Sequence, residues 1–168
     1  MSNLKIKAFP DPVLRLKAVR VKSVGIAEQK ELNDMASAMY LNSGVGLAAT
    51  QVGILKQLIV IDIGEGLMKL VNPVLTKEAG SESGEEGCLS VPGECVLIKR
   101  AKRVAVDFLD ESGLHSHIKA DGLLARALQH EIDHLQGKLI IDYLGPVRKL
   151  LVRARGGRKK KKVANGAV

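Results

Sequence analysis

A pair of histidines four residues apart is the feature of this chain with the clearest chemistry. The pair belongs to the segment His130-Glu131-Ile132-Asp133-His134. An α-helix has 3.6 residues per turn, so residues four apart project from one face about one turn apart. Two imidazoles arranged in this way can hold a transition metal. Glu131 adjoins the first histidine, where its carboxylate could take a proton from a water on the metal and act as general base.

Two histidines are too few for a catalytic site, which usually has three protein ligands and one position for water. Cys88 and Cys95 are candidates for the third ligand because thiolates bind zinc and ferrous iron strongly. Gly87 permits an unusual backbone conformation and a close approach to a metal beside Cys88. Cys95 lacks such a neighbour and is expected to be a small, semi-buried hydrophobic residue. His115 and His117 share a strand face, but we expect them to be ordinary surface residues.

The segments that must position these residues predict an α+β fold. Their expected order is a helical turn starting at Asp11-Pro12, a helix over residues 26–42, strands at 57–63, 67–71 and 104–108, and a hairpin turn at 110–113. Asn72-Pro73 is expected to close the second strand. Because short turns rather than helices separate the strands, the sheet is expected to be antiparallel.

The helix that carries the histidine pair is expected to run from Asp121 as N-cap to Gly137 as C-terminal cap. The apolar stripe of this helix contains Leu124, Leu128, Ile132 and Leu135. A short basic amphipathic helix is expected to start at Pro146. We expect antiparallel strands around the central histidine-bearing helix in a catalytic domain of residues 1–155, followed by a basic, disordered tail at 156–168.

Composition and charge restrict the class of protein further. The 168 residues are 46% hydrophobic, enough for one buried core. No run of about 18 apolar residues and no signal peptide is visible, so we expect no membrane contact and a location in the bacterial cytoplasm or an organelle matrix. The net charge is +8, but nine of the 26 Lys and Arg lie from Pro146 onward, leaving 17 against all 18 Asp and Glu in residues 1–145. The body of the chain is therefore not basic.

Three segments together resemble the signature motifs of the peptide deformylase family. They are GVGLAATQ at residues 44–51, EEGCLS at 85–90 and QHEIDH at 129–134. A weaker resemblance extends from Asp11 to Tyr143. The resemblance implies a metal-dependent hydrolase that removes the formyl group from the N-terminal formylmethionine of newly synthesised polypeptides and releases formate.

The same resemblance implies roles for individual residues. One divalent ion would be held by Cys88, His130 and His134 plus one water, with ferrous iron, Fe(2+), as native metal and zinc or nickel able to replace it. Oxyanion stabilisation would fall to the side-chain amide of Gln51 and the backbone N–H of Leu89, and Glu131 would shuttle the proton. By resemblance, the substrate peptide would pair with the backbone of Val45, Gly46 and Gly87 as an added strand. Leu123, Ala127 and Val45 suit an apolar pocket for its methionine side chain, because residues one turn before His130 are positioned near the metal.

Two residues depart from the family pattern. Many members carry an aliphatic residue where this chain has Arg126, one turn before His130; we expect the stem of Arg126 to cover the pocket wall and its head to stay in water. Some members have an arginine, thought to contact the substrate main chain, in place of Cys95. Lys99 and Arg100 follow closely, and either compensate for that loss or are solvated strand residues.

Two acidic residues keep two interpretations each. Glu86 is either a partner of the metal or its ligands, or one of a charged pair on a loop. Asp133 either orients a histidine or makes solvent contacts on the helix.

The segment at residues 146–162 ends in five consecutive cations, Arg158 to Lys162. Such a segment gains affinity for nucleic acid by releasing counterions, which suggests contact with ribosomal RNA near the emerging chain. The alternative is a solubilising terminus, since two Phe, two Tyr and no Trp leave little material for base stacking.

Two other functions compete with the deformylase interpretation. A zinc endopeptidase shares the two-histidine helix, but usually takes a third histidine or a glutamate as ligand and has no need of EEGCLS. An RNA-associated protein with a structural metal would need a fourth protein ligand, which among the cysteines only Cys95 could supply.

Overall fold

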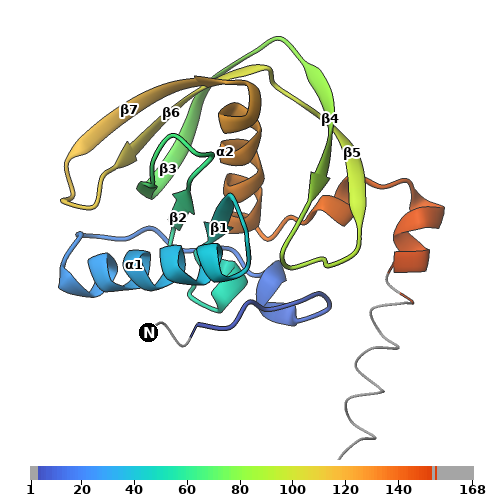
Figure 1. Ribbon diagram of the computed structural model, residues 1–168, viewed down its shortest axis with the longest axis horizontal. Coiled ribbons are helices and arrows are strands. Elements are labelled where there is room, and N and C mark those ends of the chain that lie inside the picture. Colours follow the sequence, from blue (N-terminus) through green and yellow to red (C-terminus); the bar gives the residue numbers. More distant parts are fainter. Residues whose placement is uncertain (1–3, 153, 155–168) are drawn as a thin grey trace, which may run out of the picture.

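The computed structural model describes residues 4–152 and residue 154 (Figure 1). Its elements in chain order are η1 (Pro12–Arg15), α1 (Ile26–Leu41), β1 (Gly46–Ala48), η2 (Ala49–Val52), β2 (Leu58–Ile61), β3 (Met68–Ala79), β4 (Glu82–Gly87), β5 (Cys95–Arg100), β6 (Arg103–Leu109), β7 (His115–Asp121), α2 (Gly122–Leu135) and η3 (Ile140–Tyr143). Residues 146–152 are also helical, as expected from Pro146 onward. No helix in this part of the chain is long and apolar enough to cross a membrane.

The strands form two separate sheets, and all their pairings are antiparallel. One has five strands in the order β1-β2-β3-β6-β7, and the other is the β4–β5 hairpin, residues 82–100. Figure 1 shows α2 between the five-stranded sheet and the hairpin, with α1 crossing beneath β1 and β2. The expected α+β class with antiparallel strands is confirmed. The expected domain end at residue 155 and the tail at 156–168 lie outside the described residues.

Strand β2 explains why two helices pack on this sheet from opposite sides. Its four residues are all apolar and fully buried, and a strand alternates its side chains between two faces. Leu58 and Val60 pack in one cluster with the buried face of α1, whereas Ile59 and Ile61 pack in another with the buried face of α2. The continuous apolar run therefore fixes α2 on the sheet, and with it the histidine pair.

The β4–β5 hairpin rests on a third hydrophobic cluster of its own. In β5 the side chains alternate between exposed and buried, which directs Val96 and Ile98 inward. The other buried members of this cluster are Leu14, Val91, Leu139, Ile140, Ile141 and Val152. The segments before α1 and after α2 thus support the hairpin.

The expectation that Asn72-Pro73 closes a strand is wrong, because β3 continues to Ala79. Asn72 adopts a positive φ of 53°. Its side-chain amide accepts a hydrogen bond from the backbone N–H of Val21 and donates one to the carbonyl of Val21, both at 2.8 Å. The pairing of β3 with β6 shifts register between Val71 and Val74, so a bulge accommodates the proline and the strand resumes.

Both expected ends of α2 are confirmed by the structure. Asp121 is the N-cap residue of α2, although its side chain makes no capping hydrogen bond. Gly137 adopts a positive φ of 74° just after the helix, as a C-terminal cap requires.

The hairpin turn expected at residues 110–113 joins β6 and β7. In this turn the Asp110 carboxylate accepts hydrogen bonds from the N–H groups of Ser112 and Leu114.

Asp142 makes the stability of this fold depend on pH in the acid range. Burial alone would raise the pKa of Asp142, but hydrogen bonds from Arg15, the Leu139 N–H and Lys149 lower that pKa from its ordinary value of 3.8 to about 2. A lowered folded-state pKa stabilises the fold above the unfolded pKa, and this contribution is lost as pH falls through the folded value.

We therefore expect the Asp142→Asn variant to unfold more easily than wild type near neutral pH, with the difference shrinking as pH falls from about 4 to about 2. Urea unfolding of metal-free protein at several pH values measures this difference. A gap between the two proteins that stays constant with pH would contradict it.

Candidate metal centre

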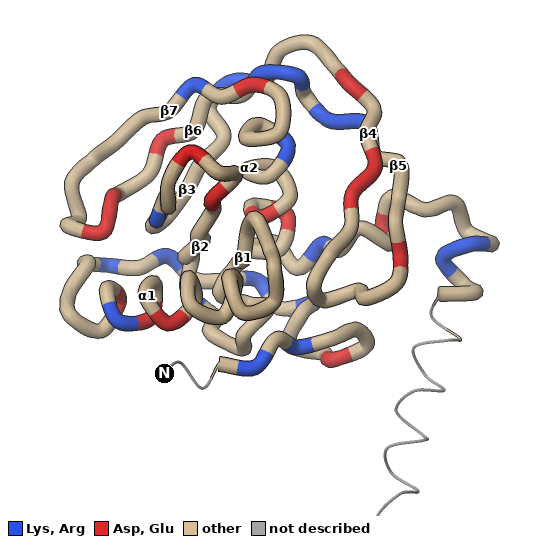
Figure 2. Tube along the Cα trace, in the orientation of Figure 1, with Lys and Arg blue, Asp and Glu red and all other residues tan. Residues whose placement is uncertain are grey.

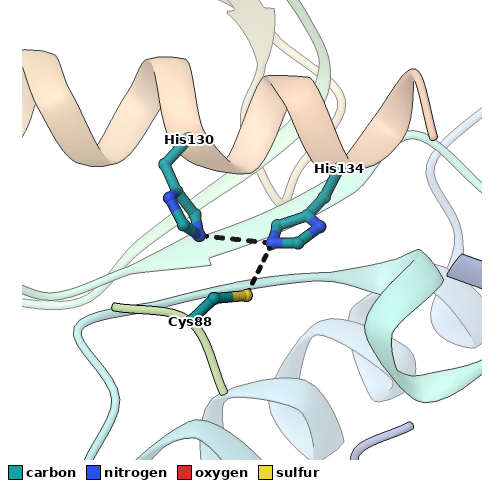
Figure 3. Close-up of side chains that lie close together, drawn as sticks. All are labelled: Cys88, His130 and His134. Carbon is teal, nitrogen blue, oxygen red and sulfur yellow. Dashed lines mark hydrogen bonds between the residues drawn. The ribbon is translucent and has the colours of Figure 1, made fainter. Parts of the chain in front are cut away.

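Three side chains converge on one point between α2 and the β4–β5 hairpin (Figure 3). The Nε2 atoms of His130 and His134 are 3.2 Å apart, and the Sγ atom of Cys88 lies 3.2 Å from Nε2 of His134. The three ligand atoms lie within 4.8 Å of one another. Bonds of about 2.0–2.3 Å at tetrahedral angles place ligand atoms about 3.3–3.6 Å apart, so a small divalent cation fits this donor set.

The two halves of this cluster come from different parts of the fold. His130 and His134 project from the same face of α2, as their spacing predicts (Figure 3). Cys88 is the first residue after β4, in the loop that leads to β5. The carbonyl of Cys88 accepts a hydrogen bond of 2.9 Å from the N–H of Val91, which holds this loop in a turn.

The backbone expected at Gly87 is not observed. Gly87 is absent from the described glycines with a positive φ, and a Cβ atom built there would meet nothing within 4 Å. The missing side chain instead leaves open space beside Cys88, and Gly87 lines the adjoining cavity.

Glu86 is the partner of the first histidine, one of the two roles the sequence left open. Its carboxylate lies 2.9 Å from Nδ1 of His130 and accepts hydrogen bonds from Nε and Nη2 of Arg100 at 2.8 and 2.9 Å. Burial alone would raise the pKa of Glu86, but its hydrogen bonds with Arg100 and His130 lower it to about 2. A His130 that donates from Nδ1 to this carboxylate keeps its Nε2 lone pair directed at the cluster.

Arg100 is neither a solvated strand residue nor exposed to the substrate cavity. Its side chain is 7% exposed and donates from Nη1 to Asp133 at 2.6 Å and to Tyr143 at 3.0 Å. Asp133 thus reaches the histidines only through Arg100 and Glu86, an arrangement that neither interpretation of Asp133 included. Lys99 is exposed on β5.

Arg126 lines the adjoining cavity, as expected of its stem, but its head does not stay in water, so that part of the expectation is wrong. The side chain is 15% exposed, and Nη1 donates to Glu86 at 2.9 Å and to the carbonyl of Ile98 at 3.0 Å. The Glu86 carboxylate and the hairpin carbonyls accept most of the hydrogen bonds of the guanidinium.

Glu131 lies in a space that only a glycine leaves free. Its side chain is buried, and a Cβ atom at Gly46 would lie 2.4 Å from its Oε1. Its Oε2 has no hydrogen-bond partner among the described residues. Burial raises the pKa of Glu131 to about 7. Such an orphaned buried oxygen is typical of a group that acts on a bound water or substrate.

His134 is fully enclosed. Burial holds the pKa of His134 well below its ordinary value, so the ring is neutral, which is the form that binds a metal. Its Nδ1 has no partner among the described residues.

Gln51 directs its amide nitrogen at the cluster. Its Oε1 accepts a 2.8 Å hydrogen bond from the N–H of Ala48, which fixes the orientation of the amide. Its Nε2 then lies 3.7 Å from Sγ of Cys88 and donates to the hydroxyl of Ser90 at 3.2 Å. A hydrogen-bond donor is thus held next to the three candidate ligands.

A cavity of about 440 Å³ opens beside the cluster. The predicted site residues among its lining are Val45, Gly46, Gln51, Gly87, Cys88, Leu89, Leu123, Ala127, His130 and Glu131. The lining residues that the sequence did not single out are Ser43, Gly44, Glu85, Val91, Gly93 and Glu94. Their only signal in the sequence was their position within or beside the motifs.

The remaining metal candidates lie elsewhere. His115 and His117 are on β7, where exposed His117 pairs with Asp107. Cys95 is exposed, so the expected semi-buried position is wrong. Within residues 4–152 and 154, the only cluster of His, Cys, Asp and Glu with metal-binding geometry is that of Cys88 and the two histidines.

Comparison with known proteins agrees with this geometry. The family model described as "Polypeptide deformylase" matches residues 3–150. The chain belongs to this family. A peptide deformylase of Thermoanaerobacter pseudethanolicus is 51% identical over 137 residues, which cover 82% of this chain and 86% of that protein.

Solved deformylase structures share the fold. The peptide deformylase from Legionella pneumophila superposes with a TM-score of 0.88 at 41% identity, covering 97% of this chain and 98% of that one. The peptide deformylase from Ehrlichia chaffeensis in complex with actinonin gives a TM-score of 0.91 at 38% identity, covering 95% and 98%.

Proposed function

We propose that this deformylase removes the formyl group from the N-terminal formylmethionine of newly synthesised polypeptides, using a divalent metal held by Cys88, His130 and His134. One observation supports this assignment above all. The three ligand atoms lie within 4.8 Å of one another beside a cavity that Glu131 and Gln51 also line. Family membership supports the reaction, and the geometry supports the choice of residues.

The donor set suits a catalytic ion. A thiolate and two neutral imidazoles bind ferrous iron, zinc or nickel, and three protein ligands leave a position for water. A divalent ion bound there lowers the pKa of a coordinated water from about 15.7 toward about 7 and polarises a carbonyl. We infer Fe(2+) as the native ion, with zinc or nickel able to replace it. Metal analysis of protein purified without oxygen tests that identity.

Glu131 is the proposed general base. Its unpartnered Oε2 is buried beside the histidine ligands, where it can take a proton from the attacking water and return it to the departing α-amine. Gly46 leaves the space that this carboxylate occupies, because any side chain at position 46 would displace it.

Gln51 and Leu89 are the proposed donors to the oxyanion. Negative charge gathers on the formyl oxygen as water attacks, and preorganised N–H groups stabilise it. The Gln51 amide is already held by Ala48, so it needs no reorientation during the reaction. Leu89 follows Cys88 directly and lines the same cavity.

The substrate is proposed to lie along the cavity wall. The backbone of Val45, Gly46 and Gly87 would pair with the peptide as an added strand, and Val45, Leu123 and Ala127 would surround the methionine side chain. Val45 and Leu123 are 48% and 55% exposed, so their apolar surface is available to a ligand. We expect actinonin, which the Ehrlichia chaffeensis structure contains, to compete for this cavity.

A formate assay tests the proposed function. Formyl-Met-Ala-Ser is incubated with iron- or nickel-loaded enzyme, with the unformylated peptide as control. Formate from the first peptide and no cleavage of the second would support a deformylase. Cleavage within the unformylated peptide would indicate an endopeptidase, and loss of the metal in a Cys95→Ser variant would indicate a closed structural site.

We further propose that residues 1–155 are the catalytic domain and that the enzyme acts in the bacterial cytoplasm or an organelle matrix.

We also propose that residues 146–162 contact the ribosome. Lys and Arg are interspersed with Asp and Glu over the body of the molecule (Figure 2). The helix at 146–152 instead presents exposed Val147 and Leu150 beside Arg148 and Lys149. Co-sedimentation with ribosomes should weaken with salt and after deletion of residues 156–168. Equal binding without that segment would count against the contact.

A further inference from the structure

The metal ligands face each other across the boundary between two sheets. Cys88 follows β4 of the two-stranded sheet, whereas His130 and His134 lie on α2, which packs against the five-stranded sheet. No strand pairing joins the two sheets in the described part of the chain. Side-chain contacts, rather than strand pairing, therefore join the hairpin to α2.

Arg126 spans this boundary from the helix side. It lies one turn before His130, and its Nη1 donates to Glu86 Oε1 at 2.9 Å and to the Ile98 carbonyl at 3.0 Å. Its Nη2 donates to the Glu82 carbonyl at 3.0 Å. One guanidinium thus bonds both strands of the hairpin and the carboxylate that orients His130.

The hairpin is shaped to receive this guanidinium. A Cβ atom on Gly84 would lie 2.9 Å from both Cζ and Nη2 of Arg126. Gly84 is not among the described glycines with a positive φ, so the backbone conformation does not call for a glycine. Position 84 therefore needs a glycine because a larger residue would overlap the guanidinium of Arg126.

Arg100 joins the hairpin to α2 from the hairpin side, and a comparison with it shows what is distinct about Arg126. Arg100 belongs to the hairpin, and both its bonds to Glu86 stay within that hairpin. It reaches α2 only through Asp133 at 2.6 Å, three residues beyond His130. Arg126 holds the helix one turn before His130, so the two arginines fix α2 on either side of the first ligand.

We propose that Arg126 is a positioning residue that sets the distance between the Cys88 thiolate and the histidine pair. This inference rests on the proposed ligand set. Arginine suits the role because its planar fork donates in several fixed directions at once, whereas lysine offers a single ammonium. An aliphatic residue would fill the volume but join nothing to β4 or β5.

Zinc affinity, measured by competition with a chromophoric chelator, tests the proposal without using activity. Supporting residues around a metal typically change affinity by 10–100-fold, so we expect Arg126→Leu to raise the zinc Kd by about tenfold or more. Gly84→Ala should do the same by displacing the guanidinium. The double variant should bind zinc within about twofold of Arg126→Leu, because the space left by Gly84 no longer matters once the arginine is absent. Arg126→Lys should recover only part of the affinity.

The control is Arg103→Leu, which removes an exposed arginine of β6 that takes no part in the contacts described above. It should leave the zinc Kd unchanged. The cobalt-substituted protein gives a second readout, since its thiolate-to-metal absorption should weaken in Arg126→Leu and Gly84→Ala. Should Arg126→Leu fail to fold, Gly84→Ala and Arg126→Lys carry the same comparison.

Wild-type zinc affinity in Arg126→Leu or in Gly84→Ala would overturn the proposal. Losses that multiply in the double variant would also overturn it, because they would show that the two residues act independently. Failure of the ligand set has a different outcome: Cys88→Ala would then bind zinc as tightly as wild type.

Discussion

Replacement of Glu131 by glutamine is expected to lower kcat for formyl-Met-Ala-Ser by about 10²–10⁴-fold, the range that a general acid–base contributes. The amide keeps the shape of the side chain and its fit against Gly46, where a Cβ atom would lie 2.4 Å from Oε1. It cannot accept and return a proton. The fold and the metal ligands should therefore be unaffected while turnover is lost.

Formate release under single-turnover conditions, beside the metal content of each sample, measures this effect. A Glu131→Asp variant is the matched comparison, because it keeps a carboxylate but withdraws it from the cluster by one methylene. Full activity of Glu131→Gln with one metal per chain would exclude Glu131 as the base. An inactive variant that has also lost its metal would point to a role in metal binding instead.

Gln51→Leu is expected to lower kcat by about 10²–10³-fold, the cost typical of one lost oxyanion donor. The Nε2 donor, 3.7 Å from Cys88 Sγ, disappears while the three candidate ligands remain. The substitution also leaves the Ala48 N–H without its 2.8 Å partner, so some loss of thermal stability accompanies it.

Gln51→Glu separates the loss of the amide donor from the loss of the hydrogen bond with Ala48. The carboxylate can still accept from Ala48 but no longer offers the amide donor. Both variants should lose kcat to a similar extent, with KM much less affected, if transition-state stabilisation is what the amide provides. Retained activity in Gln51→Glu would assign the loss in Gln51→Leu to the disturbed turn.

The sequence predicted what depends on local spacing. His130 and His134 share a helix face because four residues make about one turn, and neither tertiary contact nor burial is needed to see it. Alternation in Val104, Val106 and Phe108 likewise predicted β6. The choice of Cys88 over Cys95 required the resemblance to a family, because both have the same chemistry and lie in segments without strong periodicity.

The supporting network could not be predicted, because its partners are far apart in the chain. Glu86 meets Arg126 across 40 residues and His130 across 44. An arginine on an amphipathic helix is ordinarily solvated, and nothing local to Arg126 shows that β4 passes over it. The pairing of Gly46 with Glu131 has the same origin, since only the folded chain shows which side chain fills the space beside a glycine.

Because the β4–β5 hairpin is separate from the main sheet, the metal that we propose would also contribute to the stability of the fold. A cation held by Cys88 and His134 would close a loop between residues 46 apart in sequence, much as a disulfide does in a secreted domain. Unlike a disulfide, this cross-link is a binding equilibrium. It contributes about 2.7 kcal/mol when the free ion is at about 100 times its Kd and vanishes when the ion is scarce. The resistance of this enzyme to unfolding would thereby depend on the metal supply of its surroundings.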